Sequence, residues 1–405
     1  MLPTFGRNKI HKCRNQTYFV VMSNESHIEL EAALYKYIET FFEKVNVHNA
    51  HLAISEFDEN WKIIPDSIED ESKYGKSLYI LSKAHIELPT TTVKDVKLLS
   101  KLVNEYVDLH HSFIRKYGPI YDVLYHAIGI CWHKVGADKK AVASFKKHIY
   151  YNISSSYFAA RSITAYHFSK CDKYLRKSLM NEQLVLSSPT IFNDPFDTPF
   201  LPLLESDSSD INKLMYKAYQ EGLKVACFTS NPLNNLNSEV RNDEKQTNCE
   251  AIFFESLMWA HYADSHKGVC IKYKFNSSVS KVACTDENVV AYFYNINYYN
   301  GHVENLKSPD GSISFEKAFF YKGIQWKYEN ELRFLYFDVN GKGEHATISI
   351  PNSIEAIYFG LNCPKKDKRK ILKIMKGKNV LFYEMQMDEE HFGQLRTVPY
   401  KDSNI

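Results

Sequence analysis

Hydrophobic and polar residues alternate most regularly over residues 326–337, which read WKYENELRFLYF. A period of two, with many aromatic residues, predicts a β-strand. On one continuous strand, Glu329, Glu331 and Arg333 would project from the same face, with the two carboxylates about 7 Å apart. Burying charged groups costs free energy unless they are paired or serve a function, so two interpretations follow. This segment is either the catalytic strand of a small-molecule-handling domain or a solvated strand with an ordinary Glu–Arg pair.

The first half of the chain carries mainly helical spacing. Apolar residues predict a helix over about 93–113, which we expect to end at Gly118 and Pro119. Shorter patterns predict a strand at 18–22, a capped helix from Ser26 to about residue 41, and strands at 51–54 and 77–81.

A helix–turn–helix with its turn at residues 136–138 follows. Its small and aromatic residues resemble the packing positions of a tetratricopeptide unit: Gly129, Trp132, Gly136, Ala141, Ser144, Phe145 and Ile149. A repeat stack needs about three units, and only one is clear here. We therefore expect one hairpin, at about 119–152, within a mainly helical N-terminal domain (1–152). The hairpin is either a binding surface for an antitoxin or regulatory protein or simply two packed helices.

After a polar linker the pattern changes to short strands and turns. This predicts an α+β domain at 160–400 with mostly antiparallel strands. The expected strands are 164–168, 184–186, 225–229, 268–275, 289–299, 331–337, 346–350, 356–359 and 380–385, and the expected helices are about 173–180, 251–263 and 365–376.

Three segments of this second half carry candidate chemistry. In helix 251–263, Met258, His261 and Tyr262 share a face, which predicts either a pocket-lining helix end or a core His and Tyr. Residues 192–197 (FNDPFD) form a turn with two carboxylates, and magnesium binding there is a less favoured alternative to a structural role. Residues 365–378 hold eight Lys and Arg against one Asp, which indicates either a solvated helix face or a nucleic-acid footprint.

The composition of the chain limits the classes of function that the sequence supports. Lys and Arg number 50 against 48 Asp and Glu, so net charge gives no argument for nucleic-acid or membrane binding. The sequence has neither an N-terminal signal-peptide pattern nor an apolar run long enough to span a membrane. Its eight Cys are scattered without zinc-ligand spacing, which favours reduced thiols and a cytoplasmic location.

Several motifs occur in a fixed order across the second half. They are YHF at 166–168, FNDPFD at 192–197, CFT at 227–229, MWAHYAD at 258–264, WxYExExR at 326–333 and IYFG at 357–360. Together, over about residues 162–395, they resemble a bacterial family of uncharacterised domains found in predicted defence and toxin genes. Their order is similar to that of the ADP-ribosyltransferase superfamily of the His–Tyr–Glu type.

This resemblance implies an ADP-ribosyltransferase-like domain that uses NAD. By position, His167 would hold the ribose and amide, Tyr262 would stack on nicotinamide, and Glu331 would stabilise the oxocarbenium ion. Glu329 would orient or deprotonate the acceptor. Arg333 and Lys322 would hold the catalytic carboxylate or contact the pyrophosphate. The remaining expected cofactor-binding residues are Asn193, Asp194, Trp259 and His261.

The implied function is a toxin or anti-phage defence effector that transfers ADP-ribose to a nucleic acid or a protein. The Ser-Thr-Ser signature of arginine-modifying toxins is missing, which argues against protein arginine as the acceptor. Two alternatives stay open: a non-catalytic binding or sensor protein, and a metal-dependent nuclease that uses Asp194, Asp197 and the glutamates.

Overall fold

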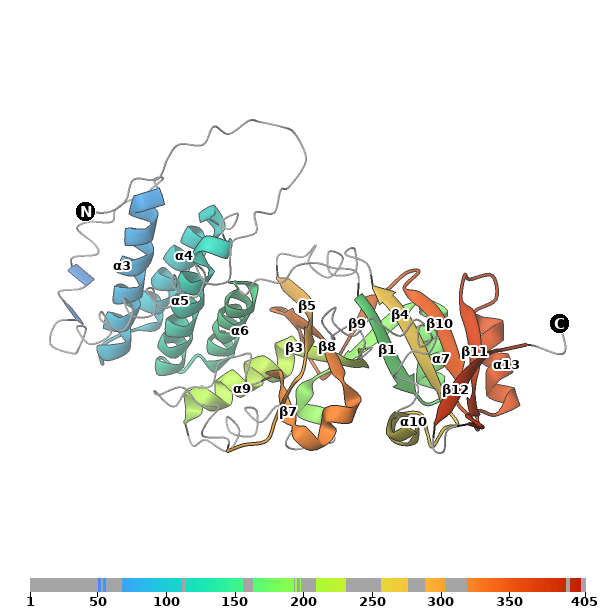
Figure 1. The fold of residues 1–405 in the computed structure, drawn as a ribbon. Helices are drawn as coiled ribbons and strands as arrows, with labels where there is room; N and C mark the ends of the chain where they lie inside the picture. Colours follow the sequence, from blue (N-terminus) through green and yellow to red (C-terminus); the bar gives the residue numbers. More distant parts are fainter. Residues whose placement is uncertain are drawn as a thin grey trace, which may run out of the picture.

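A computed structural model gives the fold of the chain (Figure 1). It describes residues 50–51, 54–55, 68–110, 114–155, 163–192, 194, 197, 209–230, 256–275, 288–302, 319–390 and 394–401. The elements expected at 18–22 and 26–41 lie outside the described residues.

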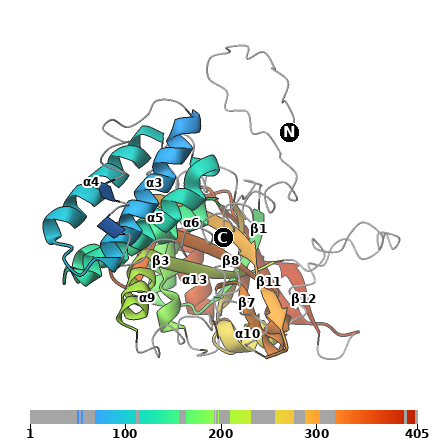
Figure 2. The same ribbon diagram turned by 90° about the vertical axis from the view of Figure 1, so that its left-hand side faces the viewer.

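The first part of the described chain is helical. It comprises α3 (Ile68–Glu87), α4 (Val93–His110), α5 (Ile114–Lys134) and α6 (Asp138–Ser155). Figure 2 shows these helices side by side, to one side of the sheet.

Three predictions for this helical part are wrong. Residues 77–81 belong to α3, where Tyr74, Leu78 and Leu81 are buried at helical spacing. Residues 51 and 54 are helical, so no strand covers 51–54. The helix expected from Val93 is present as α4, but Gly118 and Pro119, which were expected to mark its end, lie inside the first turns of α5, where few backbone N–H groups have a helical partner to lose.

The hairpin of α5 and α6 turns where the tetratricopeptide resemblance places its turn. Gly136 has φ +74°, a left-handed conformation that suits glycine. Gly129 lets the two helices approach, because a Cβ atom there would lie 2.4 Å from Cε1 of Phe145. Trp132 and Phe145 are buried in the same core.

The second part of the chain is built on a curled sheet. Its main strands are β1 (Ile163–Ser169), β2 (Gln183–Ser187), β3 (Leu223–Thr229), β4 (Val269–Phe275), β5 (Val289–Asn295), β8 (Glu331–Asp338), β9 (His345–Ser349), β10 (Ile354–Phe359), β11 (Leu381–Met387) and β12 (Leu395–Pro399). The order is β12-β11-β10-β4-β1-β3-β2-β9, with β8 paired to β3 and β5. Among the strands that the structure describes, only β10 and β11 pair in parallel within this sheet. The prediction of a helical region followed by a mixed, largely antiparallel sheet is confirmed.

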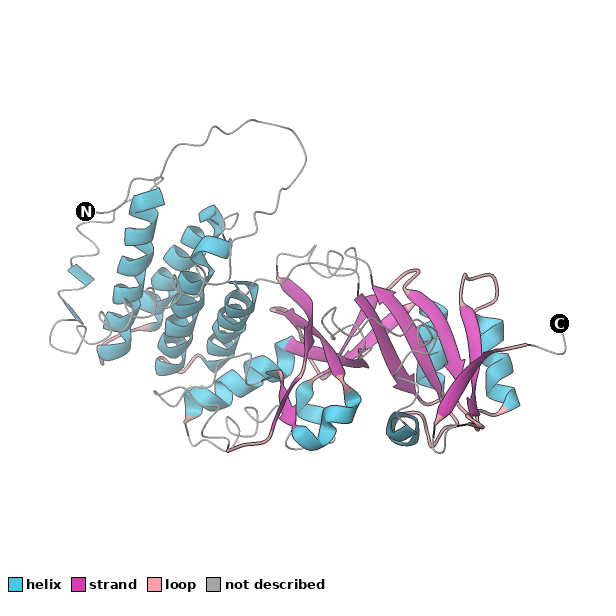
Figure 3. Ribbon diagram, in the orientation of Figure 1, coloured by secondary structure: helices cyan, strands magenta, loops and turns pink. Residues whose placement is uncertain are grey.

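The sheet opens between β1 and β3. These strands are bridged at one residue pair, Tyr166 with Thr229, whereas β1 pairs with β4 over its full length. The strands therefore diverge into two groups, β1, β4 and β10 to β12 on one side and β3, β5 and β8 on the other, as Figure 3 shows.

Helices cover both faces of the first group. The helices α7 (Lys173–Asn181) and α13 (Lys365–Ile374) share one core with β1, β4 and β10. On the opposite face, α10 (Ser256–Tyr262) packs Met258 and Trp259 against Tyr166 and Phe168.

The remaining elements lie around the strands β3 and β8. They are the 3-10 turns η2 (Pro189–Ile191) and η6 (Ile324–Glu329), helix α9 (Asp210–Gly222), and the parallel pair β6 (Asn297–Tyr299) and β7 (Tyr321–Gly323). One core joins Phe145 of α6, Tyr219 of α9, and Leu335 and Phe337 of β8. The helical region is therefore packed directly on the sheet. None of the helices in the described ranges has the length and apolar character needed to cross a membrane.

The close contact at Gly129 generates a stability prediction. Replacing Gly129 with Ala places a methyl group against Phe145, and overpacking of a core costs about 1–3 kcal/mol, which exceeds the roughly 0.5–1 kcal/mol gained from a better helix former. We expect urea denaturation to show a lower free energy of unfolding for Gly129→Ala. The added substitution Phe145→Leu should recover part of the loss. An increase in stability for Gly129→Ala alone would contradict the packing described here.

Candidate active site

The acidic segment is not one continuous strand. Residues 324–329 form the 3-10 turn η6, Asn330 adopts a left-handed conformation (φ 42°, ψ 52°), and β8 begins at Glu331. The Asn330 side chain donates to the backbone oxygen of Ser230 at 2.8 Å, which fixes this turn. The predicted common strand face therefore holds for Glu331 and Arg333 and is wrong for Glu329.

Arg333 is the buried centre of the site, with 1 % of its surface exposed. Its Nη2 donates to both carboxylate oxygens of Asp197, at 2.6 and 2.8 Å. Its Nε donates to Oε1 of Glu331 at 2.5 Å, and its Nη1 donates to the backbone oxygen of Phe319 at 2.9 Å. A guanidinium held by two carboxylates and a carbonyl has little freedom to move, so it fixes both acids in place.

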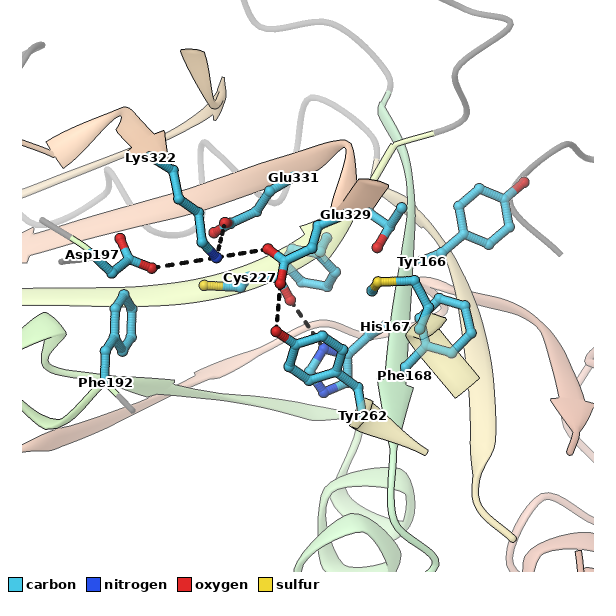
Figure 4. A pocket seen from close by; sticks show the side chains of 13 residues that line it. Tyr166, His167, Phe168, Phe192, Asp197, Cys227, Tyr262, Lys322, Glu329 and Glu331 are labelled. Atoms are coloured by element: carbon cyan, nitrogen blue, oxygen red, sulfur yellow. Dashed lines mark hydrogen bonds and ion pairs between the residues drawn. The ribbon is translucent and has the colours of Figure 1, made fainter. Parts of the chain in front are cut away.

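Lys322 brings Glu329 into the same network (Figure 4). From β7, its Nζ lies 2.6 Å from Glu329, 3.0 Å from Glu331 and 3.4 Å from Asp197. Both glutamates thus meet at one ammonium group, although one lies in a turn and the other in a strand. The network holds three carboxylates and two cations.

The two glutamates have pKa values pushed in opposite directions. Burial alone would raise the pKa of Glu331, but the charges of Arg333 and Lys322 outweigh burial and lower it to about 2. For Glu329, burial dominates and raises the pKa, although Lys322 and Tyr262 work against that shift. A pair of acids separated in this way gives one permanent carboxylate and one group suited to proton transfer.

Neighbouring polar groups hold the two acids. The Tyr262 hydroxyl donates a short hydrogen bond to Oε1 of Glu329. The backbone N–H of Glu331 donates to the hydroxyl of Tyr298 at 2.7 Å. The Cys227 thiol hydrogen-bonds to the Glu331 side chain, and burial together with that carboxylate raises the pKa of the thiol. Cys227 is therefore a neutral donor.

His167 is held as a neutral ring. Its Nδ1 lies 3.1 Å from the backbone oxygen of Cys227, so the proton belongs on Nδ1 and Nε2 is left as an acceptor. Burial lowers the pKa of His167, against the effect of the Cys227 carbonyl. The described residues provide no hydrogen-bond partner for Nε2.

These groups surround a cavity of about 150 Å³ at the point where β1 and β3 diverge. It is lined by Tyr166, His167, Phe168, Phe192, Asp197, Cys227, Phe228, Thr229, Met258, Tyr262, Lys322, Glu329 and Glu331. Cavities of about this size in other proteins hold a single aromatic ring. The site thus combines one ring-sized apolar space with a wall of charged groups.

The structure brings together part of the predicted site. Five predicted residues line the cavity: His167, Tyr262, Lys322, Glu329 and Glu331. Asp194 does not line it, but its backbone oxygen accepts from the N–H of Asp197 at 3.1 Å. Asn193 lies outside the described residues.

Three other predicted ligand contacts do not fit this cavity. Trp259 is fully buried, with its ring against Phe168 at a centroid distance of 5.0 Å. His261 is exposed, because the end of α10 turns Tyr262 inward and His261 outward. Arg333 lies behind the carboxylates and holds them, so it does not reach a ligand in the cavity.

Three contributors to the site were not predicted from the sequence. The sequence suggests Asp197 only as a turn residue or metal ligand, and it assigns no role at the site to Cys227 or Tyr298. The acid at the end of FNDPFD was the available signal for Asp197. Within the described ranges, no group of three or more His, Cys, Asp or Glu is arranged to hold a metal ion.

The lowered pKa of Glu331 predicts acid sensitivity. Its folded pKa of about 2 lies below an unfolded value of about 4.3, so its contribution to stability is present above the unfolded value and disappears as the pH falls towards 2. The difference corresponds to about 3 kcal/mol. Glu329 acts in the opposite sense, because its pKa is raised in the folded state. Its contribution to stability is present at low pH and is lost as the pH rises through the folded pKa.

Urea denaturation from neutral pH down to acid pH tests this linkage. Glu331→Gln should be less stable than the wild type at neutral pH and should lose less stability on acidification. The exposed residue Glu344 provides the control Glu344→Gln. Parallel pH profiles for the wild type and Glu331→Gln would contradict the assignment.

Comparison with known proteins finds a similarity over one segment of the chain, which includes part of this site. Searches of curated proteins and of solved structures gave no significant match. One family model matches residues 258–334, which is narrower than the predicted range of about 162–395. The matched segment contains Tyr262, Lys322, Glu329 and Glu331 but neither His167 nor Asp197. Over this segment the chain is similar to an uncharacterised family described as "Protein of unknown function (DUF2971)".

Proposed function

We propose that this protein is an NAD-consuming enzyme of the ADP-ribosyltransferase type, which breaks the N-glycosidic bond to nicotinamide and transfers ADP-ribose to an acceptor. The observation that carries the proposal is that His167, Tyr262 and Glu331 line one cavity. They come from three distant parts of the chain, and they are the residues that the resemblance assigns to cofactor binding and catalysis.

The cavity fits the reacting end of the substrate. A space of about 150 Å³ accommodates one ring, so nicotinamide would enter while the rest of NAD stays outside. Phe192 and Tyr262 supply aromatic walls for that ring. His167 Nε2, as an acceptor, would take a hydrogen bond from a ribose hydroxyl or the amide N–H.

Glu331 suits the charge that develops during this reaction. As the C–N bond breaks, its electron pair leaves with nicotinamide and positive charge grows on the ribose carbon. A carboxylate held rigidly in a dry site stabilises that charge more in the transition state than in the ground state. Arg333 and Lys322 keep Glu331 ionised. Asp197 accepts two hydrogen bonds from Arg333, and its negative charge helps to balance the two cations, so the site carries no excess of positive charge.

Glu329 suits proton transfer from the acceptor. When ionised, it would take the proton released as the acceptor oxygen or nitrogen bonds to the ribose carbon. Burial raises its pKa, which makes it a stronger base than an ordinary carboxylate. Tyr262 orients it through the short hydrogen bond to Oε1.

Two alternatives have less support. A nuclease would need carboxylate oxygens free for a divalent cation, but those of Asp197, Glu329 and Glu331 already meet Lys322 and Arg333. A purely structural network would account for the buried Arg333, but it gives no reason for the adjoining cavity or for the Nε2 of His167, which has no hydrogen-bond partner among the described residues. The role as a toxin or defence effector acting on a macromolecule rests on the family resemblance.

Nicotinamide release from NAD tests the proposal. The full chain is incubated with NAD, with and without a cell extract as a source of acceptors, and nicotinamide is quantified by chromatography. We expect Glu331→Gln to lower kcat/KM by about 100-fold or more, because it removes the charge that stabilises the transition state. Glu344→Gln, an equivalent change at an exposed position, should keep wild-type activity.

The thermal melting of each variant separates catalysis from folding. A Glu331→Gln protein that stays folded at the assay temperature and releases nicotinamide at the wild-type rate would refute the catalytic assignment. Absence of nicotinamide release by the wild type, with and without extract, would refute the proposed activity.

A further inference from the structure

The helices α7 and α13 lie side by side and run in the same direction. Cys171 and Cys363, each two residues before one of these helices, have their Sγ atoms 4.0 Å apart. Beyond their other ends, Nζ of Lys378 lies 3.1 Å from Glu182 and 3.3 Å from the backbone oxygen of Leu179. Leu175 and Leu179 of α7 are buried in the same core as Ile371 of α13, so the solvent-facing stripes of the two helices are adjacent.

These stripes are strongly basic. We define the basic face as Lys173, Lys177, Lys366, Arg369, Lys373 and Lys376, all of which are exposed. On α13 the spacing of 366, 369 and 373 places three cations along one line of the helix, and Lys376 follows in the turn after it. Within the described part of the chain, none of the six forms an ion pair, whereas nearby Lys368, Lys370 and Lys378 each have an acidic partner.

Helix stability does not account for this charge pattern. Cations in the first turn oppose the helix dipole, yet Lys173 begins α7, and Lys365 and Lys366 begin α13. The whole chain carries a net charge of only +2, so these cations are segregated onto one surface rather than reflecting a basic protein.

We propose that the basic face is a docking surface for nucleic acid, which it contacts through the phosphate backbone. Two adjacent lines of unpaired cations match the repeated phosphates of a strand. Tyr174 lies within this surface, is 66 % exposed and has Nζ of Lys173 5.0 Å from its ring centre, which provides a stacking position for a base. An anionic membrane is a poorer match, because Ile371 of α13 is only 1 % exposed and the other apolar residues of this helix, Leu372 and Ile374, are partly buried against the same core.

This surface is separate from the cavity and does not rest on the proposed chemistry. The basic face covers one side of β1, β4 and β10, and α10 with Tyr262 lies on the other. Binding is measured without NAD, so failure of this inference and failure of the proposed activity are distinguishable.

The proposal is tested by measuring the affinity of the full chain for nucleic acid by fluorescence anisotropy. The probes are a labelled DNA duplex of random sequence and a labelled RNA strand of the same length. We expect binding that weakens steeply as salt rises. The triple variant Lys366→Glu, Arg369→Glu and Lys373→Glu should bind at least about tenfold more weakly, and the slope of log affinity against log salt should fall by about three. Lys366→Glu places an anion in the first turn of α13, where the helix dipole favours it, and Lys373→Glu places one in the last turn, where the dipole disfavours it, so the two effects on helix stability oppose each other.

The matched control reverses three exposed charges elsewhere: Lys94→Glu, Lys97→Glu and Lys101→Glu on α4. It makes the same change in net charge and should bind like the wild type. A neutral triple variant, with Gln at 366, 369 and 373, should give an intermediate loss. Equal weakening by the α4 control, or binding to phosphatidylserine vesicles without binding to either nucleic acid, would overturn the proposal.

Discussion

The site depends on how the charge of Arg333 is neutralised. A guanidinium with 1 % exposure is tolerated in a protein interior only when its hydrogen bonds are satisfied, and Asp197, Glu331 and the Phe319 carbonyl satisfy them. Removing one partner of such a pair costs about 3–5 kcal/mol, because the other charge stays buried. Lys322 extends the network to Glu329. The separation of the two glutamate pKa values follows from this arrangement, since Glu331 meets both cations and Glu329 meets only one.

The second half of the fold was more predictable from sequence than the geometry of the site. Short runs of apolar and aromatic residues predicted β1, β3, β4 and most other strands, and most side chains of β3 and β4 are indeed buried. The acidic segment was misread because Trp326 and Tyr328 continue the alternation through a 3-10 turn, and only Asn330, a residue that tolerates left-handed backbone, marked the break. The ion pair of Arg333 with Asp197 joins residues 136 positions apart, so no local pattern predicts it.

The helical region also contributes to this arrangement. Leu335 and Phe337 lie on the same face of β8 as Glu331 and Arg333, and they pack in the core that contains α5, α6 and α9. Lys146 of α6 reinforces the contact, with Nζ 2.6 Å from Glu221 and 2.9 Å from the backbone oxygen of Gly341. The helical region is therefore in direct contact with the strand that carries both the catalytic candidate and its supporting arginine. The short hairpin resemblance alone did not indicate this shared core.

The most direct test is a crystal structure of the Glu331→Gln variant soaked with NAD. The substitution keeps the shape of the side chain and slows turnover, so the bound substrate can be located. The proposed function predicts density for the nicotinamide ring in the cavity between His167 and Tyr262, with the ribose next to residue 331. An empty cavity at saturating NAD, or NAD bound at another surface, would contradict it.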